Sequence, residues 1–433
     1  MNVPFFIATK VAATGQRSFS RLIIRIAVAA VALSVAVMIV ATSLIAGFKK
    51  EISDKIFGFW GHIHITEADV NRTFLDVYPV SREQDFYPGL DTIGRISYWE
   101  PYRIFGIETS MMRERKTHGG VRHAQVFALN PGIIETKNAI EGIVLKGIST
   151  DFDWAFLDRY LQEGQRLDLT DTVASDGILI SRQTADRLNL SLGDRFIVYF
   201  VQNNNQLRRA FRIEGIYKTG LEEYDRKFAL VDIRKIQQLL GWEEDQVAGF
   251  EVFVDDLRDL SVLSEYIYVE KLPRNLYAET IRDKLPNIFE WLELQDINEK
   301  VILALMLIVS IINMVTALLI LILERTNMIG ILKALGQRDW GIRQIFLYYG
   351  MFILGVGLFW GNLIGLGLCF VQQYFKVITL SEADYYLAVA PVHIDVWTVL
   401  GLNLLTAAVT LVFLLLPSYL VSRIRPVQAI RFK

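Results

Sequence analysis

The sequence is poor in the residues from which catalytic and metal sites are most often built. It has one cysteine, Cys369, so no intramolecular disulfide can form, and only five histidines. It contains no G-x-x-x-x-G-K-[ST], no G-x-S-x-G and no H-E-x-x-H motif. A P-loop nucleotide site, a nucleophile elbow and a zinc-protease helix are therefore excluded within this sequence.

Two histidines are the only residues whose spacing could suit a metal. His62 and His64 are two apart on an expected strand, so they share a face, but no third ligand is evident nearby. Carboxylates such as Glu222, Glu223 and Asp225 are more typical of a solvated face than of an acid/base pair. We therefore expect no enzyme, no catalytic residue, no metal and no cofactor bound by this chain itself.

Charge is nearly absent from four long apolar runs, and the mean hydropathy of the chain is +0.32. The runs span residues 22–48, 301–323, 345–375 and 396–421. A helix needs roughly 20 apolar residues to cross a bilayer, so the sequence predicts four transmembrane helices. The first run is longer than the apolar core of a signal peptide and indicates an uncleaved anchor.

Basic residues in the short flanks predict the orientation of these helices. They gather in residues 1–21, 324–343 and 422–433, whereas the loop 376–395 is mainly acidic. By the positive-inside rule, both termini and the 324–343 loop are cytoplasmic, and residues 49–300 and 376–395 lie outside. The basic residues accompany apolar runs and form no basic patch on a folded face, so we expect no nucleic-acid partner.

Residues 49–300 are net acidic and alternate between strand and helix patterns, which predicts a large α+β extracytoplasmic domain between helices 1 and 2, with two lobes. The expected elements are a strand at 61–66, a pair formed by 104–118 and 121–130 around Gly119 and Gly120, a strand and helix at 178–190 with Ser181 as N-cap, a hairpin of 195–202 and 207–218, a strand and helix at 228–240 closed by Gly241, a strand at 249–254, and a helix at 277–299 that could bend at Pro286.

Polar groups inside the spans suit helix contacts better than transport of ions. The second, third and fourth spans contain no Asp, Glu or His, which argues against a channel or a proton-coupled carrier. Gly357, Gly361 and Gly365 repeat every four residues and therefore line one helix face. That face could pack within the chain or form a dimer seam.

The cytoplasmic segment from Glu324 to Asp339 is the most informative part of the sequence. It predicts a short helix closed by Gly336. An apolar stripe with helical spacing follows one side of it, formed by Met328, Ile331, Leu332 and Leu335. Such a stripe lies either on lipid or in a groove of a partner protein.

This segment reads E-R-x-x-x-I-G-I-L-K-A-L-G and resembles the coupling-helix region of the MacB/FtsX/Lol superfamily of ABC transporter permeases. One helix, a large outer domain and three further helices agree with that superfamily, as does the sequence around residues 46–61. Within it, the lipoprotein-releasing permeases LolC and LolE are most similar, on the residues at 188–194, 221–228 and 386–397.

The resemblance implies a non-catalytic subunit of the bacterial inner membrane. It would extract lipoproteins and pass them to a periplasmic LolA-like carrier, driven by ATP bound to a separate LolD-like ATPase, and it would pair with a second copy or a paralogue. The residues expected to dock on the ATPase are Glu324, Arg325, Met328, Ile329, Gly330, Ile331, Leu332, Lys333, Leu335 and Gly336.

The resemblance also places two further contacts. Lipid chains would enter between the first two helices, beside Val40, Leu44, Ile302, Leu305 and Ile308. In LolC a long hairpin grips the carrier. The corresponding stretch here, residues 202–209, is short and lacks prolines, so either this chain does not bind the carrier or a reduced version of the contact remains, at Gln202, Asn204, Arg208 and Arg209.

Two other functions remain open from the sequence. An FtsX-like regulator of periplasmic cell-wall hydrolases would keep the same fold, and a membrane-anchored sensor would not need the cytoplasmic stripe. The identity of the cargo and the choice between homodimer and heterodimer also remain open.

Overall fold

The computed structural model describes residues 18–68, 78–104, 107–136, 140–171, 173–202 and 205–423. The chain divides into two compact units. Unit 1 comprises residues 1–51, 290–379 and 389–433, and unit 2 comprises residues 52–289 and 380–388. Four of the described helices are long and apolar enough to cross a membrane, and each of them contains one of the four predicted spans.

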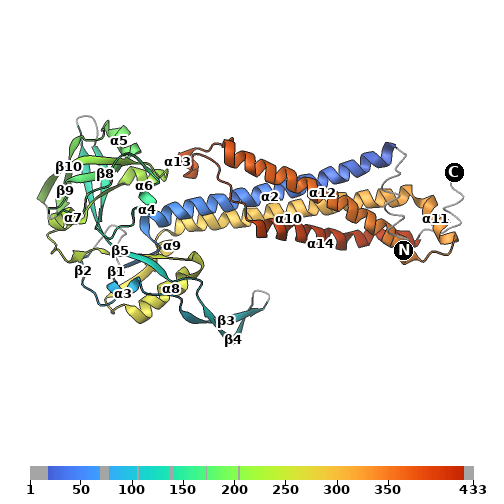
Figure 1. Cartoon of the computed structure of the whole chain (residues 1–433), viewed down its shortest axis with the longest axis horizontal. Coiled ribbons are helices and arrows are strands. Elements are labelled where there is room, and N and C mark those ends of the chain that lie inside the picture. The colour runs from blue at the N-terminus through green and yellow to red at the C-terminus, as the bar shows by residue number, and fades with distance from the viewer. Residues whose placement is uncertain are drawn as a thin grey trace. The chain divides into compact units, whose positions relative to one another are not determined.

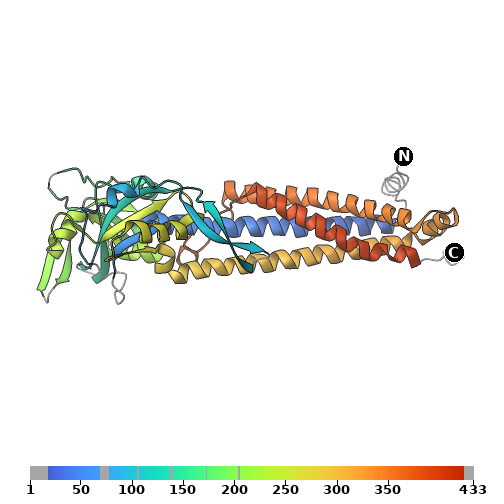
Figure 2. The same cartoon turned by 90° about the horizontal axis from the view of Figure 1, so that it is seen from below.

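The long helices of unit 1 run side by side in both views (Figures 1 and 2). They are α2 (Ser18–Trp60), α10 (Pro286–Glu324), α12 (Asp339–Phe375) and α14 (Val396–Ser418), joined by the short helices α11 (Thr326–Ala334) and α15 (Leu420–Arg423). Helix α2 continues well past the predicted end at residue 48. Its last turns bury Ile52, Ile56 and Trp60 completely, which places them in the core of unit 2.

The glycine-lined face of α12 packs against α2 within the same chain. A Cβ at Gly357 would lie 2.7 Å from Val31 Cγ1, and one at Gly361 would lie 2.7 Å from Val35 Cβ. At Gly365 the nearest atom would be the Ala36 Cα at 3.1 Å. Because glycine lets two helix backbones approach closely, this face is occupied inside unit 1 and is not a free dimer seam.

A reciprocal amide pair joins α12 to α14. Asn362 Nδ2 donates to Asn403 Oδ1 at 2.7 Å, and Asn403 Nδ2 donates to Asn362 Oδ1 at 2.9 Å. Each amide also donates to a backbone carbonyl one turn earlier in its own helix. These two side chains therefore form the kind of hydrogen bond between helices that we expect of polar groups inside the spans.

Unit 2 is built on a ten-stranded mixed sheet. Its order is β14-β1-β13-β5-β6-β11-β8-β10-β7, and β9 pairs with β10 and β5. The strands are β1 (Ile63–Glu67), β5 (Val121–Glu135), β6 (Ile140–Ile148), β7 (Leu161–Gly164), β8 (Gly177–Ser181), β9 (Arg195–Gln202), β10 (Asn205–Tyr217), β11 (Phe228–Asp232), β13 (Gly249–Val254) and β14 (Leu276–Thr280). The first half of β5 pairs with β13 and its second half with β6 and β9, so the two halves of the sheet share this strand.

The remaining elements of unit 2 lie outside the ten-stranded sheet. They are the pairs β2 (Val80–Ser81) with β12 (Gln246–Val247) and β3 (Ser97–Ile104) with β4 (Ile107–Lys116), and the helices α3 (Tyr87–Leu90), α4 (Trp154–Leu157), α5 (Arg182–Leu188), α6 (Glu222–Lys227), α7 (Ile233–Leu240), η1 (Leu257–Asp259), α8 (Leu260–Tyr266), η2 (Ile267–Lys271), α9 (Ile281–Lys284) and α13 (Glu382–Tyr385).

Several local predictions are confirmed. Ser181 ends β8 and caps α5, where its side chain accepts a hydrogen bond from the Thr184 N–H. Gly241 closes α7 with a φ of 69°, in the left-handed region that glycine adopts without strain. β9 and β10 form the predicted hairpin around residues 203 and 204, which lie outside the described residues.

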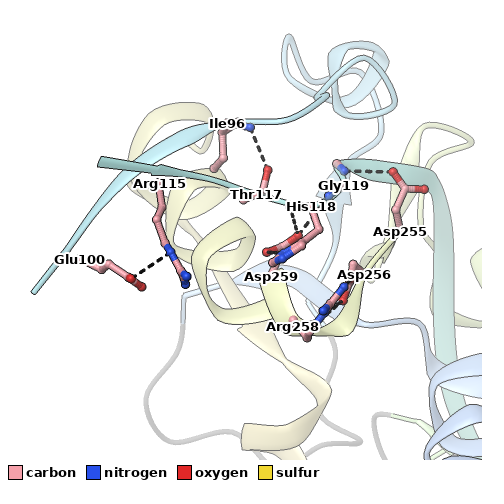
Figure 3. Close-up of polar contacts among 11 residues, drawn as sticks. Ile96, Glu100, Arg115, Thr117, His118, Gly119, Asp255, Asp256, Arg258 and Asp259 are labelled. Atoms are coloured by element: carbon pink, nitrogen blue, oxygen red, sulfur yellow. Dashed lines mark hydrogen bonds and ion pairs between the residues drawn. The ribbon is translucent and has the colours of Figure 1, made fainter. Parts of the chain in front are cut away.

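The predicted pairing of residues 104–118 with 121–130 is wrong. Strand β4 pairs with the strand before it, β3. Strand β5 pairs instead with β13 and β6. The chain turns away after β4 because two carboxylates take up the backbone N–H groups of this corner. Asp259 accepts from the N–H groups of His118 and Gly119, and Asp255 accepts from that of Gly120 (Figure 3).

The predicted helix over residues 277–299 is also wrong in its first part. Residues 276–280 form strand β14, which pairs with β1. Leu276 and Ala278 are buried and alternate with more exposed neighbours. Burial of every second residue is the pattern of a strand, and it replaces the expected helix here. Pro286 is the first residue of α10 rather than a bend within a helix, as suits a residue without an N–H group.

An ion pair lies in the core of unit 2. Lys146 Nζ is 2.7 Å from Glu251 Oε1, and both side chains are almost completely buried. Lys146 also donates to the Phe59 carbonyl at 2.5 Å, and Gln125 donates to Glu251 Oε2 at 2.7 Å. Burial lowers the pKa of Lys146 and raises the pKa of Glu251, because it disfavours each charged form, while the mutual attraction of the pair opposes both shifts.

Candidate functional site

The loop between α10 and α12 forms the short helix that the sequence predicted. Helix α10 ends at Glu324 and α11 begins two residues later at Thr326. Thr326 Oγ1 donates to the Leu323 carbonyl at 2.6 Å, and the Ile329 N–H donates to the Arg325 carbonyl at 3.0 Å. The start of α11 is therefore tied directly to the last turn of α10.

The end of α11 is closed by Gly336, as predicted. Gly336 has a φ of 86°. Its N–H donates to the Lys333 carbonyl at 3.0 Å, and the Gln337 N–H donates to the Leu332 carbonyl at 3.0 Å. These two bonds make a Schellman motif, which satisfies the last carbonyls of the helix and turns the chain toward α12.

The four residues of the predicted apolar stripe do not share one environment. Met328 and Leu332 are half-buried and pack against the core of unit 1. Ile331 is 54% exposed and Leu335 is 79% exposed. The residue that anchors the helix is Ile329, which is fully buried. Because it lies about 100° around the helix from Met328, the buried face is rotated and half of the stripe faces outward.

Basic side chains brace α11 against the last described helix. Lys333 Nζ lies 3.0 Å from Asp339 Oδ1 and donates to the Ser422 carbonyl at 3.2 Å. Arg343 Nε donates to Ser422 Oγ at 3.0 Å, and its guanidinium lies 4.7 Å from the centre of the Tyr419 ring. These contacts hold the loop in one geometry.

The sequence did not predict three of these bracing residues. Arg343, Ser422 and Tyr419 belong to no motif, and the last two lie far along the chain from α11. Trp340 was also missed, although it is 56% exposed at the start of α12. A tryptophan next to a basic loop is a signal in the sequence that could have extended the predicted docking surface.

The residues proposed to border a lipid path lie in two settings. Val40, Leu44 and Ile302 are half-buried, whereas Leu305 and Ile308 are about half exposed on α10. Near residue 48 of α2 and residue 291 of α10, an ion pair and an aromatic contact connect the two helices. Lys49 Nζ lies 2.5 Å from Asp296 Oδ1, and the rings of Phe48 and Trp291 are 5.4 Å apart.

The hairpin residues proposed to meet a carrier are only partly described. Gln202 is the last residue of β9, and Asn204 lies outside the described residues. Arg208 and Arg209 are exposed on β10. Register places Arg208 opposite Tyr199 and Arg209 opposite Val198, so the two arginines point to opposite faces of the hairpin.

The two closely spaced histidines are both engaged with the backbone. His62 Nδ1 accepts from the Val254 N–H at 2.7 Å, and His64 Nε2 lies 2.6 Å from the Trp60 carbonyl. Burial lowers the pKa of His62 to about 3, with Arg122 and Arg282 adding to the shift. Within the described residues, no group of three or more His, Cys, Asp and Glu side chains is arranged to hold a metal ion.

Family models cover most of the chain. The model of the MacB-like periplasmic core domain matches residues 26–270, and the model of the FtsX-like permease C-terminal domain matches residues 300–426. The chain belongs to the MacB/FtsX superfamily of ABC transporter permeases. The match of the first model agrees with the large domain expected between helices 1 and 2, and that of the second includes α11.

Curated relatives extend the match over nearly the full length. The chain is 23% identical to the lipoprotein-releasing system transmembrane protein LolC of Xylella fastidiosa, over 93% of this chain and 92% of that protein. It is 22% identical to LolE of Haemophilus influenzae, over 99% of each chain. These relatives and the four apolar helices make it a multi-pass inner-membrane permease.

One solved structure is also similar. The extracellular domain of the ABC-type transporter YknZ from Gram-positive bacteria is 13% identical, with a TM-score of 0.31. The match covers 50% of this chain and 98% of that domain.

Proposed function

We propose that this chain is the permease subunit of an ABC complex that extracts lipoproteins from the inner membrane and passes them to a periplasmic carrier. A separate ATPase subunit binds and hydrolyses ATP, because this sequence carries no P-loop. The relatives named lipoprotein-releasing proteins support this role, since they align with the chain from end to end.

The observation that carries the proposal is the exposed half of α11. Ile331 and Leu335 project from a helix whose opposite side is anchored by Ile329 and whose end is braced through Lys333. An apolar pair on a fixed helix suits insertion into a groove of a partner protein. In this proposal the partner is the ATPase, and the loop 324–343 and both termini are cytoplasmic.

The proposed lipid path lies between the helices α2 and α10. Lipid chains of the cargo enter between them, and the Lys49–Asp296 contact is then the outer closure of that path.

The complex contains a second permease, either another copy or a paralogue. Movement of α11 passes along α10 and α12 to the outer domain, so that no cargo has to cross the bilayer.

Substitutions on α11 test the coupling. We expect Ile331→Asp or Leu335→Asp to abolish co-purification of the ATPase with the tagged full-length chain in mild detergent, because each would bury a charge in an apolar groove. Asn327→Asp is the matched control, since Asn327 is exposed on the same helix and the substitution adds the same charge. Mass spectrometry of the co-purifying proteins provides the measurement.

The same experiment separates the two functions that the fold allows. An ATPase together with acylated lipoproteins supports the release function. An ATPase together with a cell-wall hydrolase or its adaptor would indicate an FtsX-like regulator instead. Equal recovery of the ATPase from Leu335→Asp and Asn327→Asp would contradict the proposed coupling surface.

A further inference from the structure

A two-stranded arm in unit 2 takes no part in the main sheet. Strands β3 and β4 pair with each other in antiparallel register from Ser97 opposite Lys116 to Ile104 opposite Ile107. No other described strand pairs with either of them. Both views show the arm projecting from the rest of unit 2 (Figures 1 and 2). A hairpin that stands alone in water is marginally stable, so such an arm implies a surface that it meets.

Large apolar side chains are exposed along this arm. Trp99 is 65% exposed, Met111 73% and Met112 55%. Register sets Met112 opposite Pro101, and Pro101 is two residues from Trp99, so these three side chains share one face. Tyr102, which is also exposed, follows Pro101 in the strand and lies on the other face. Both faces of the arm therefore carry exposed apolar groups.

Basic groups accompany the apolar ones. Glu100 forms an ion pair with Arg113 and lies 3.2 Å from Arg115 Nε, so one carboxylate faces two guanidinium groups. The Arg113 guanidinium also lies 5.4 Å from the centre of the Tyr102 ring. Lys116 adds a further positive charge at the end of β4. Aromatic and guanidinium groups together are characteristic of polypeptide at a membrane–water interface.

The base of the arm, in contrast, is held firmly (Figure 3). The buried carboxylate of Asp259 accepts from the N–H groups of His118 at 2.6 Å and Gly119 at 3.1 Å, and it lies 3.1 Å from His118 Nδ1. Thr117 Oγ1 accepts from the Ile96 N–H at 2.9 Å. The direction of the arm is thus fixed at its root, while its length carries the exposed side chains.

We propose that the β3–β4 arm inserts into the outer-leaflet interface of the membrane that this chain spans. Lipid fits better than a protein groove because apolar groups lie on both faces of the arm, whereas a groove receives one face. Along the sequence, residues 52–289 are joined at both ends to helices long and apolar enough to span, so a bilayer is a surface that unit 2 always has within reach. Lys116, at the end of β4, carries a charge that suits the phosphates of the lipid headgroups, while Arg113 and Arg115 are paired with Glu100.

This inference goes beyond the proposed function and does not depend on it. An arm in the interface would give the outer domain a lipid contact of its own, in addition to its two helical tethers. Recovery of the ATPase and release of lipoprotein report on the proposed function, whereas the contact of the arm with lipid can be measured without either.

Fluorescence quenching by lipid tests the proposal. Because Cys369 is the only cysteine, a Cys369→Ala chain can carry a single new thiol at Met112→Cys, labelled with an environment-sensitive fluorophore. The full-length chain is reconstituted in phosphatidylethanolamine/phosphatidylglycerol vesicles, with and without lipids that bear a nitroxide near the headgroup. The matched control is Val173→Cys, an exposed apolar position of unit 2 outside the arm.

We expect the nitroxide lipid to remove most of the emission at position 112 and little of it at position 173. Adding Trp99→Ser and Met111→Ser together should reduce insertion by about a hundredfold, because each large apolar side chain contributes roughly one order of magnitude to partitioning. Equal quenching at the two positions would overturn the proposal. A blue-shifted but unquenched label at position 112 would also overturn it, because the arm would then be covered by protein.

Discussion

The two units of this chain bury polar groups in different ways. Among the described residues of unit 1, every buried polar side chain is uncharged, and α12 and α14 are joined by a neutral amide pair. Unit 2 buries a complete ion pair, Lys146 with Glu251, together with the neutral imidazole of His62. The contrast shows where each unit obtains its specificity: close glycine contacts between helices in unit 1, and a buried ion pair in unit 2.

The difference follows from the surroundings of each unit. A helix in lipid cannot recover the cost of an unpaired charge, so contacts between small residues and neutral hydrogen bonds hold the helices together. A water-facing domain can bury charges when every charged group has a partner, although removal of one partner is then costly. Variants of the two units should therefore differ in how much free energy of unfolding they lose and in how that loss depends on pH.

The largest effect is expected from Lys146→Met. The substitution leaves Glu251 buried without its cation, and loss of one partner of a buried pair typically costs about 3–5 kcal/mol. We expect this loss in the free energy of unfolding of the full-length chain. Lys227→Met is the control, since it breaks an exposed ion pair with Glu223 and should have little effect. If the two variants were equally stable, the ion pair would have no structural role.

A smaller effect is expected in unit 1 from Gly361→Leu. Even a Cβ at this position would lie 2.7 Å from Val35 Cβ and 2.9 Å from the Ala32 carbonyl oxygen, so α2 and α12 must move apart. Overpacking of this kind costs up to about 3 kcal/mol. The thermal unfolding midpoint in detergent should fall. Gly367→Leu on the same helix is the control: a Cβ at Gly367 would meet nothing within 4 Å, so this variant should change the midpoint far less.

The third effect concerns pH and unit 2. The pKa of His62 falls from 6.5 to about 3 on folding, because burial disfavours the charged ring. Between pH 6.5 and about pH 3, the His62 ring is protonated in the unfolded chain but not in the folded chain. The contribution of His62 to the free energy of unfolding is therefore complete above pH 6.5 and is lost as the pH falls toward 3. At about pH 5 the loss is about 2 kcal/mol.

His62→Asn isolates this contribution. Asparagine keeps an acceptor for the Val254 N–H but does not titrate. The thermal unfolding midpoint of the variant should therefore fall less steeply with decreasing pH than the midpoint of the parent chain. Above pH 6.5 the two midpoints should depend on pH in the same way. Parallel curves for the two proteins would show that His62 already titrates normally in the folded chain.

The sequence was sufficient for the parts of the fold that local chemistry decides. The four spans follow from apolar length alone, and α11 follows from helical spacing that ends at Gly336. The cap at Ser181 and the stop at Gly241 are likewise fixed by the residues themselves. In each case the deciding groups lie within a few positions of one another along the chain.

What the sequence could not predict depends on contacts between distant residues. The buried face of α11 is fixed by Ile329 and by Ser422, which lies in another helix at the end of the described chain. The partner of β4 depends on Asp259, whose carboxylate fixes the corner after that strand. Neither residue belongs to a motif, so only the folded chain reveals its role.

The most direct test of the proposed function is an ATP-dependent release assay. The full-length chain, purified with its co-purifying ATPase, is reconstituted in vesicles that contain an acylated lipoprotein, and a soluble lipoprotein carrier is added outside. We predict transfer of the lipoprotein to the carrier with ATP, and no transfer when the permease carries Leu335→Asp. ATP hydrolysis without transfer, while the lipoprotein stays in the vesicles, would contradict a releasing permease.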